Sequence, residues 1–311
     1  MKAARVHAFG EPLRIDDVPN PEPGPDDVVL DVGLAAVNPV DVWLTDGTVA
    51  GGTQQLPFVP GVEAIGSVDG RPVIVRGGGV GVTRDGTYRE RADLPRGVCV
   101  EIPEGLDPER VAGIAVTGTT AWVITNELAQ IRSEDRVLVL GASGGVGSLA
   151  VQLAKAAGAT VWGQTSSPEK ASFIESLGAD HVVVSQADEL PSRVEGLEPT
   201  AVLDPLGDRY TTAAVEILEP HGRLVLFGVS AGDRADVDLR TLYRKAIQLL
   251  TYSGTIEPDQ RNRDGLERVL AAAARGEVRV PVDEVLPLED AAEAHRRIRE
   301  RQVQGKLLLR P

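Results

Sequence analysis

Cysteine and histidine are scarce in this sequence, and their scarcity excludes two kinds of cross-link. The chain has one cysteine, Cys99, so it can form neither an internal disulfide nor a zinc site built from several thiolates. Its four histidines stand far apart, at positions 7, 181, 221 and 295, and none has HExxH or another metal-ligand spacing. We therefore predict no metal site, and we interpret Cys99 as a small buried apolar residue.

Long apolar runs and clusters of basic residues are also missing. No apolar run reaches the roughly 20 residues that cross a bilayer, and residues 1–30 lack the features of a secretory signal. Acidic residues outnumber Lys and Arg by 46 to 32, which gives a net charge of −14 and a surface that repels phosphate backbones. We predict a cytoplasmic protein that binds neither membranes nor nucleic acid.

The pattern of apolar residues divides the chain into two kinds of structure, and a length of 311 residues fits two domains. The first 100 residues are rich in Pro and Gly and predict short strands of a mostly β domain, at 28–32, 64–68, 73–75 and 98–102. From about Asp107, strands alternate with amphipathic helices, as in a parallel α/β sheet. The predicted strands there are 137–140, 160–165, 181–184, 201–203, 223–227 and 248–253.

The end of the chain loses this alternation. It predicts helices at 261–275 and 288–301, and then a short strand at 306–309. We expect this last strand to return to the N-terminal domain.

A glycine-rich segment follows the first strand of the α/β region. It reads Gly141-Ala-Ser-Gly-Gly-Val-Gly147 and opens a helix that runs to about Ala157. Glycines let the backbone turn tightly and approach a pyrophosphate, and the N–H groups at the start of the helix can bind that anion. We predict dinucleotide binding, with contacts from Gly141, Ser143, Gly144, Gly145, Val146 and Gly147.

The next strand end helps to distinguish NAD from NADP. NAD sites place Asp or Glu there to bind the ribose 2′-hydroxyl. Here the residues are Gln164-Thr-Ser-Ser167, and Ser167 is expected to cap a helix that begins at Pro168. A 2′-phosphate would be repelled by an acid and attracted by hydroxyls and a cation, so we predict NADPH, with Lys170 as the nearby cation. The alternative for Lys170 is a solvated helix lysine.

Several segments together resemble one protein family over nearly the whole chain. They are Asn38-Pro-Val-Asp41, Pro60-Gly-Val-Glu63, Gly86-Thr-Tyr-Arg-Glu90, Thr117-Gly-Thr-Thr-Ala121, the glycine loop, Leu177-Gly-Ala-Asp-His181, Gly222 to Gly228, and Gly305-Lys-Leu-Leu-Leu309. In order and spacing they are similar to the zinc-free quinone oxidoreductases of the medium-chain dehydrogenase/reductase superfamily.

The resemblance implies an α/β fold in which a Rossmann doubly wound parallel sheet accompanies a GroES-like, mostly β catalytic domain. The implied ranges are 1–118 with 256–311 for the catalytic domain and 119–255 for the NADPH-binding domain, with the active site in the cleft between them. Family contacts carry over to Ser166 and Lys170 in the 2′-phosphate pocket and to Asn38 and Thr120 near the nicotinamide. They also carry over to Phe227, Gly228 and Val229 beside the nicotinamide, and to Arg301 in the tail.

The chain also departs from its relatives. Gly61-Val62-Glu63 stands where zinc alcohol dehydrogenases have Gly-His-Glu, which favours zinc-free chemistry. Trp43, Thr45 and Thr48 occupy a stretch where many relatives carry a tyrosine. A hydroxyl or a backbone N–H could stabilise charge on a substrate oxygen, and Thr45 and Thr120 are the candidates.

The predicted reaction is hydride transfer from NADPH to a quinone or a related electron-poor carbonyl compound. An enone or enoyl-thioester reductase is the enzymatic alternative, because fold and cofactor loop do not separate the two. A non-catalytic NADPH-binding structural or redox-sensing protein is the alternative of another class. We also expect a homodimer through the Rossmann sheet edge at 248–253, unless the helix at 261–275 covers that edge.

Overall fold

The computed structural model describes residues 1–48 and 55–311, which form two compact units. Unit 1 comprises Met1–Thr119 and Pro258–Pro311, and unit 2 comprises Thr120–Glu257. The predicted divisions, after residues 118 and 255, lie one and two residues before the observed ones. The chain first passes from unit 1 to unit 2 inside helix α3 (Ile114–Trp122).

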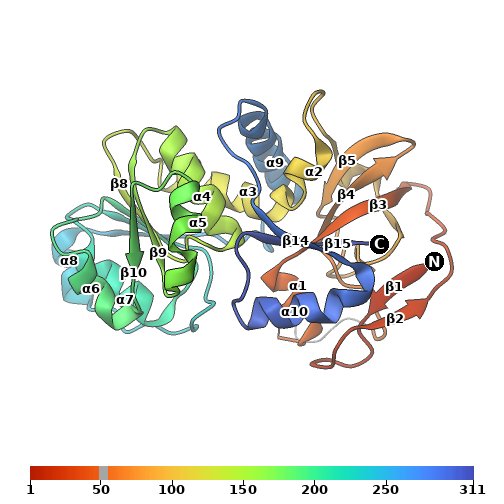
Figure 1. The fold of residues 1–311 in the computed structure, drawn as a ribbon, viewed down its shortest axis with the longest axis horizontal. Helices are drawn as coiled ribbons and strands as arrows, with labels where there is room; N and C mark the ends of the chain where they lie inside the picture. Colours follow the sequence, from red (N-terminus) through yellow and green to blue (C-terminus); the bar gives the residue numbers. More distant parts are fainter. Residues whose placement is uncertain (49–54) are drawn as a thin grey trace. The chain divides into compact units, whose positions relative to one another are not determined.

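Unit 2 is built on a six-stranded parallel sheet with the order β10-β9-β8-β11-β12-β13 (Figure 1). The chain enters at β8 in the middle, winds outward to β10, returns to β11 beside β8, and winds outward again to β13. This doubly wound topology confirms the predicted Rossmann sheet, and its switch point lies between β8 and β11. The strands are β8 (Arg136–Val139), β9 (Thr160–Thr165), β10 (His181–Val184), β11 (Ala201–Asp204), β12 (Arg223–Leu226) and β13 (Gln248–Thr251).

Helices pack on this sheet and enclose its core. Helix α4 packs on β8 and β9, α5 on β10, and α7 on β11 and β12. The central strands are continuous apolar runs because both of their faces are buried, as Val137 to Val139 and Ala201 to Leu203 show. The helical segments are η3 (Val123–Leu128, a π-helix), α4 (Gly145–Ala156), η4 (Pro168–Lys170), α5 (Ala171–Ser176), η5 (Ala187–Glu189), α6 (Leu190–Arg193), α7 (Asp208–Ile217) and α8 (Leu239–Lys245).

Unit 1 is a mostly β unit whose main sheet has the order β14-β15-β3-β4-β5-β7, with β6 also paired to β3. Strand β15 pairs antiparallel with β3, so the last strand of the chain does return to the N-terminal unit, as predicted. Strands β1 and β2 form a separate hairpin-like pair. The strands are β1 (Lys2–Arg5), β2 (Arg14–Asp17), β3 (Asp27–Val37), β4 (Glu63–Val68), β5 (Arg71–Arg76), β6 (Arg91–Pro95), β7 (Cys99–Glu101), β14 (Val282–Pro287) and β15 (Lys306–Arg310).

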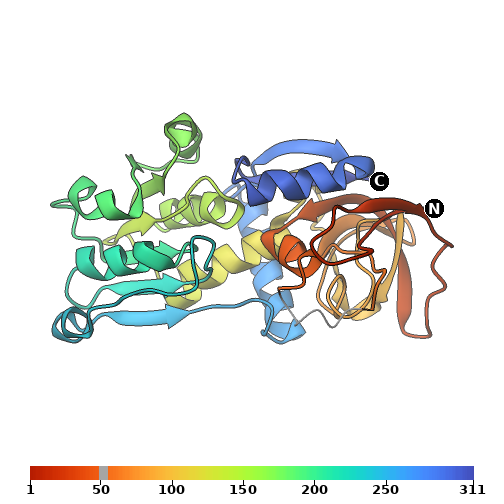
Figure 2. The ribbon, with the colours of Figure 1, turned by 90° about the horizontal axis from the view of Figure 1, so that it is seen from below.

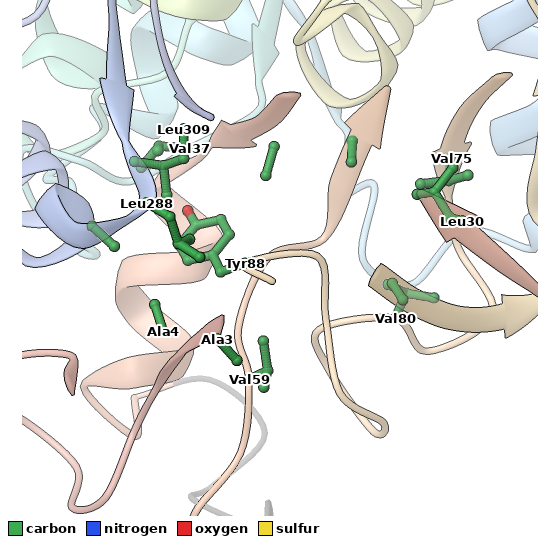
Figure 3. Packing of buried hydrophobic residues seen from close by; sticks show 14 of the residues in the cluster. Ala3, Ala4, Leu30, Val37, Val59, Val75, Val80, Tyr88, Leu288 and Leu309 are labelled. Atoms are coloured by element: carbon green, nitrogen blue, oxygen red, sulfur yellow. The ribbon is translucent and has the colours of Figure 1, made fainter. Parts of the chain in front are cut away.

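The core of unit 1 gathers side chains from both ends of the chain (Figure 3). Tyr88 is fully buried and lies in one apolar cluster with Leu30, Leu288 and Leu309. The helical segments of this unit are α1 (Pro39–Thr45), η2 (Arg96–Val98), α2 (Pro108–Val111), α9 (Asp259–Ala274), η6 (Leu288–Asp290) and α10 (Ala291–Arg299), in addition to most of α3. No helix in the described ranges is both long and apolar enough to cross a membrane.

Three local predictions need correction. Strand β3 extends beyond the predicted end at residue 32 to Val37, because β4 and β15 pair with its second half. Cys99 is partly exposed rather than buried, since it begins the short strand β7 directly after the turn η2. Ser167 precedes η4, but its side chain makes no capping hydrogen bond.

Candidate functional site

The glycine-rich loop connects β8 to α4 at the carboxyl end of the strand, beside the switch point. Gly141 has φ 57°, and its carbonyl accepts a hydrogen bond from the Gly144 N–H at 3.0 Å, which closes a tight turn. The first bond within α4 runs from Ser148 N–H to Gly144 O at 2.9 Å. The N–H groups of residues 145–147 precede this bond and have no acceptor within the helix, an arrangement that can bind an anion.

The glycines of this region are explained by different steric surroundings. A Cβ on Gly147 would lie 2.4 Å from Gly141 O, and a Cβ on Gly163 would lie 2.3 Å from Ile174 Cγ2. Both glycines are thus needed to pack the loop and the helices against the sheet. A Cβ on Gly144 would meet a single neighbour, Gly141 O, at 3.4 Å, so the glycine leaves open space on the loop. This shape fits the close approach of a pyrophosphate.

The end of β9 carries no acidic side chain, and the two residues predicted to bind a 2′-phosphate, Ser166 and Lys170, follow it. Ser166 is exposed, whereas Lys170 is only 8% exposed within η4. Such burial argues against the alternative in which Lys170 is a solvated helix lysine. Thr165 Oγ1 accepts from Ser167 N–H at 3.2 Å and so shapes the turn between them.

The predicted nicotinamide-supporting segment, residues 227–229, follows β12. It lies at the carboxyl ends of the strands, as the glycine loop does. The Phe227 N–H donates to Asp204 O at 2.9 Å, and a Cβ on Gly228 would lie 2.6 Å from Pro205 O. Val229 is 45% exposed. The segment is therefore braced against the loop that follows β11.

Asp204, which the motifs did not single out, organises that loop. It is fully buried, and its carboxylate accepts from Leu206 N–H at 2.7 Å, Gly207 N–H at 3.1 Å and Thr211 Oγ1 at 2.5 Å. Burial raises the pKa of this carboxyl, while the three hydrogen bonds oppose the rise.

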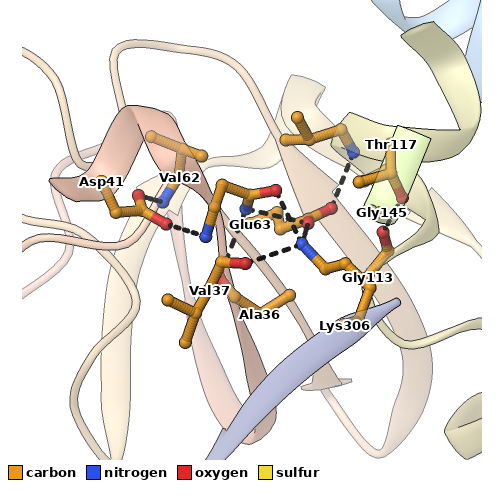
Figure 4. A network of polar contacts seen from close by, with 12 residues as sticks. Ala36, Val37, Asp41, Val62, Glu63, Gly113, Thr117, Gly145 and Lys306 are labelled. Atoms are coloured by element: carbon orange, nitrogen blue, oxygen red, sulfur yellow. Dashed lines mark hydrogen bonds and ion pairs between the residues drawn. The ribbon is translucent and has the colours of Figure 1, made fainter. Parts of the chain in front are cut away.

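In unit 1, a buried polar network includes Glu63 and Lys306 (Figure 4), and Asn38, which follows β3, bonds to both. Its Nδ2 donates to Glu63 Oε1 at 3.0 Å, and its Oδ1 accepts from Lys306 Nζ at 2.7 Å. Lys306 also donates to Val37 O at 2.9 Å, and Glu63 Oε2 accepts from Val116 N–H at 2.7 Å. Asn38 is 1% exposed, so its side chain is held rigidly by these neighbours.

Thr45, the predicted oxyanion-stabilising residue of α1, is also engaged inside unit 1. It is 1% exposed, and its Oγ1 donates to Val42 O at 2.9 Å and lies 3.4 Å from His295 Nδ1. Thr45 thus packs between α1 and α10, and its contact with a substrate stays a prediction.

A buried carboxyl stands next to these residues. Asp41 accepts from Asn38 N–H at 2.8 Å, Val62 N–H at 3.0 Å and Tyr88 Oη at 3.2 Å. Burial is the largest influence and raises the pKa of Asp41 to about 7, against the opposing effect of these donors and Lys306. The same Tyr88 hydroxyl lies 3.4 Å from His295 Nε2, so Asp41, Tyr88, His295 and Thr45 form one buried chain of polar contacts.

The predicted site residues thus fall into two groups by unit. Thr120, the glycine loop, Ser166, Lys170 and residues 227–229 belong to unit 2, whereas Asn38, Thr45 and Arg301 belong to unit 1. Thr120 is 8% exposed, and Arg301 is exposed with φ 55° just after α10. The motifs did not identify Glu63 and Lys306 as network members, although both stand in quoted segments. Among the described residues, no group of three or more His, Cys, Asp or Glu side chains could hold a metal ion.

Known proteins resemble this chain along its full length. A family model described as zinc-binding dehydrogenase matches residues 145–271. A quinone oxidoreductase of Pseudomonas aeruginosa is 28% identical and is aligned over 100% of this chain and 99% of its own length. Prostaglandin reductase-3 of Bos taurus is 30% identical, over 86% of this chain and 74% of that protein.

Solved structures give the same picture for the fold. A structure titled NAD-dependent alcohol dehydrogenase has a TM-score of 0.90 at 30% identity, and the match covers 100% of both chains. The quinone oxidoreductase of Thermus thermophilus, solved alone and with NADPH, has a TM-score of 0.87 at 30% identity, again over 100% of both chains. These matches confirm the predicted combination of a Rossmann domain with a GroES-like domain. The chain is thus an oxidoreductase that belongs to the quinone oxidoreductase family of the medium-chain dehydrogenase/reductase superfamily.

Proposed function

We propose that this protein is an NADPH-dependent oxidoreductase that transfers hydride to a quinone or a related electron-poor carbonyl compound. The observation that carries the proposal is the glycine loop at the sheet switch point. It presents the N–H groups of residues 145–147 at the start of α4, next to a β9 end without an acidic residue. A dinucleotide that carries a 2′-phosphate is the ligand that suits both features.

The preference for NADPH rests on the chemistry of the segment after β9. Ser166 offers an exposed hydroxyl, Lys170 supplies a cation, and no carboxylate stands in residues 164–168 to repel a phosphate. Two structural neighbours, one mycobacterial and one from Thermus thermophilus, are titled as NADPH complexes. The neighbour titled as NAD-dependent makes a direct comparison of the two nucleotides necessary.

Bound NADPH would supply the hydride, and the chain would bind and orient it. The loop residues Ser143 to Gly147 would hold the pyrophosphate, and Phe227, Gly228 and Val229 would support the nicotinamide. Asn38 and Thr120 would lie near the nicotinamide, and Arg301 would reach the cofactor. A hydroxyl such as that of Thr120 would stabilise negative charge on a substrate oxygen. Because the cofactor carries the chemistry, no nucleophilic side chain is required, and water can deliver the proton.

A second candidate is the reduction of an electron-poor C=C bond in an enone or enoyl thioester. The similarity to prostaglandin reductase-3 favours it. A third candidate, a non-catalytic NADPH-binding protein, would bind the nucleotide without turnover. Steady-state NADPH oxidation with a panel of quinones and enones separates the three. We expect the fastest turnover with quinones; turnover with enones alone would select the second candidate, and binding without any turnover the third.

We also propose that this activity is independent of zinc. Val62 stands where zinc alcohol dehydrogenases have a histidine, and its N–H donates to Asp41 Oδ1 at 3.0 Å. Dialysis against a chelator should leave the rate of NADPH oxidation unchanged. Stoichiometric zinc in the purified protein, with activity lost on its removal and restored on its return, would contradict this proposal.

A further inference from the structure

Gln164 lies near the end of β9, between the end of β8 and the end of β10. Its side chain is 1% exposed and bridges the two neighbouring strand ends. The Oε1 atom accepts from Gly141 N–H at 3.1 Å, and the Nε2 atom donates to Ser185 O at 2.8 Å. The Gln164 backbone carbonyl accepts from Ala142 N–H at 2.9 Å. One residue therefore holds the first two peptides of the glycine loop.

The bridge needs a side chain that accepts on one side and donates on the other. Gly141 presents an N–H and Ser185 presents a carbonyl oxygen, and a neutral amide satisfies both. A buried N–H or carbonyl left without its partner is costly, so this geometry resists displacement. The preceding Leu140 N–H is bonded to Leu203 O at 3.0 Å, which fixes the loop to the sheet from its other side.

We propose that Gln164 is a positioning residue for the pyrophosphate of the dinucleotide, an inference that rests on the proposed function. Gln164 is buried and acts through Gly141 and Ala142. It sets the direction in which the loop leaves β8, and hence where the N–H groups of residues 145–147 point. The pyrophosphate is common to NADPH and NADH, so the loss of this bridge weakens both nucleotides by the same factor.

The test is fluorescence titration of NADPH and NADH with wild type and Gln164→Met. Methionine has a similar length and volume but can make neither hydrogen bond. We expect Kd to rise about tenfold for both nucleotides with their ratio unchanged, which corresponds to about 1.4 kcal/mol. Lys170→Ala is the contrasting variant, because it should weaken NADPH alone.

Thr200→Val is the matched control for general destabilisation. Thr200 precedes β11 at the amino ends of the strands, away from the glycine loop. Its Oγ1 donates to Asp135 Oδ1 at 2.6 Å and accepts from Arg136 N–H at 3.1 Å. This variant should lower the unfolding midpoint and leave both Kd values unchanged.

Two results would overturn the inference: unchanged affinity of Gln164→Met for both nucleotides, or a loss confined to NADPH. If Gln164→Met does not fold, amide hydrogen exchange on the nucleotide-free wild type decides. The Gly141 and Ala142 amides should exchange slowly, and rapid exchange at both would contradict the bridge. A wild type that binds neither nucleotide would instead refute the proposed function itself, so the two failures are distinguishable.

Discussion

At the scale of single residues, the most consequential feature of unit 1 is a charge pair in its interior. Lys306 and Glu63 are 2% and 1% exposed, with Nζ and Oε1 3.3 Å apart, and Asn38 bonds to both. A buried ion pair is costly to desolvate. This pair is tolerated because the polar groups around it are hydrogen-bonded. The network fixes Asn38, the residue of unit 1 proposed to lie near the nicotinamide.

Removal of one partner should therefore destabilise the protein strongly. We expect Lys306→Met to lower the free energy of unfolding by about 3–5 kcal/mol, because Glu63 is left as an uncompensated buried charge. Chemical denaturation measures this, and the double variant with Glu63→Gln should recover part of the loss. Arg71→Met is the control, since Arg71 and Glu101 pair at 3.5 Å with side chains 77% and 73% exposed, and its cost should stay below about 1 kcal/mol. Equal costs for the two single variants would contradict this account.

We predict that Lys170 determines the preference for NADPH over NADH. If it binds the 2′-phosphate, Lys170→Ala weakens NADPH by about tenfold or more and leaves NADH nearly unchanged. Wild type should correspondingly prefer NADPH by at least about tenfold. Equal affinity of wild type for the two nucleotides would refute the assignment. Competition with adenosine 2′-monophosphate, which carries only the distinguishing phosphate, gives an independent measurement.

At the scale of elements, α1 and α10 pack against each other through a polar contact at their buried faces. His295 on α10 lies between Thr45 of α1 and the Tyr88 hydroxyl, and the ring centroids of His295 and Tyr88 are 5.7 Å apart. Arg299 and Asp46 close the exposed side of the same contact with an ion pair at 2.6 Å. Burial is the main cause that lowers the pKa of His295 to about 3, and Arg299 adds to the effect.

This histidine should make the stability of unit 1 sensitive to acid. The pKa in the folded chain is about 3, below the ordinary value of 6.5, so the unfolded state binds the proton more readily. The contribution of neutral His295 is complete above pH 6.5 and is lost as pH falls toward 3. Between pH 7 and 5, wild type should lose about 2 kcal/mol more than His295→Phe.

Denaturant unfolding of both proteins across this range measures the difference. Asp41 has its pKa raised to about 7 and acts in the opposite direction, but it is present in both proteins, so the comparison isolates His295. Parallel pH profiles would show that His295 is not buried in its neutral form.

At the scale of the whole chain, the sheet of unit 2 ends in an apolar edge strand, β13. Strand β13 is the last strand of the sheet and runs along its margin (Figure 2). Within this unit Leu249 is 47% exposed, and Leu239 and Tyr243 of the neighbouring α8 are 74% and 84% exposed. An exposed apolar edge invites strand pairing, so we propose a homodimer in which β13 meets its own copy across a two-fold axis.

Leu249→Lys tests this proposal, because a lysine at a strand edge opposes pairing with a second copy. We expect wild type to scatter light as a dimer at micromolar concentration and the variant to be monomeric or aggregated. Ile15→Lys, on the exposed strand β2 of unit 1 with a similar loss of apolar surface, should remain dimeric. A monomeric wild type would refute the dimer, and a variant that stays dimeric would place the contact elsewhere.

Features that depend on short segments of the chain could be predicted from the sequence. The spacing of Gly141, Gly144 and Gly147 between an apolar strand and a helix specified the phosphate loop, because glycine reports directly on backbone turns and close approaches. The alternation of strands and helices predicted the parallel sheet, and the absence of an acid at the end of β9 favoured NADPH. Helix α8 escaped prediction because none of its residues is buried, so it leaves no apolar periodicity in the sequence.

The way in which distant residues combine became visible in the folded chain. Lys306 meets Asn38 and Glu63 across 268 and 243 positions, and Gln164 reaches Gly141 and Ser185 across 23 and 21. Thr45 likewise contacts His295, 250 positions away. Local patterns carry information on backbone conformation and burial, whereas the partner of a polar side chain depends on strand order and register, which no short segment specifies.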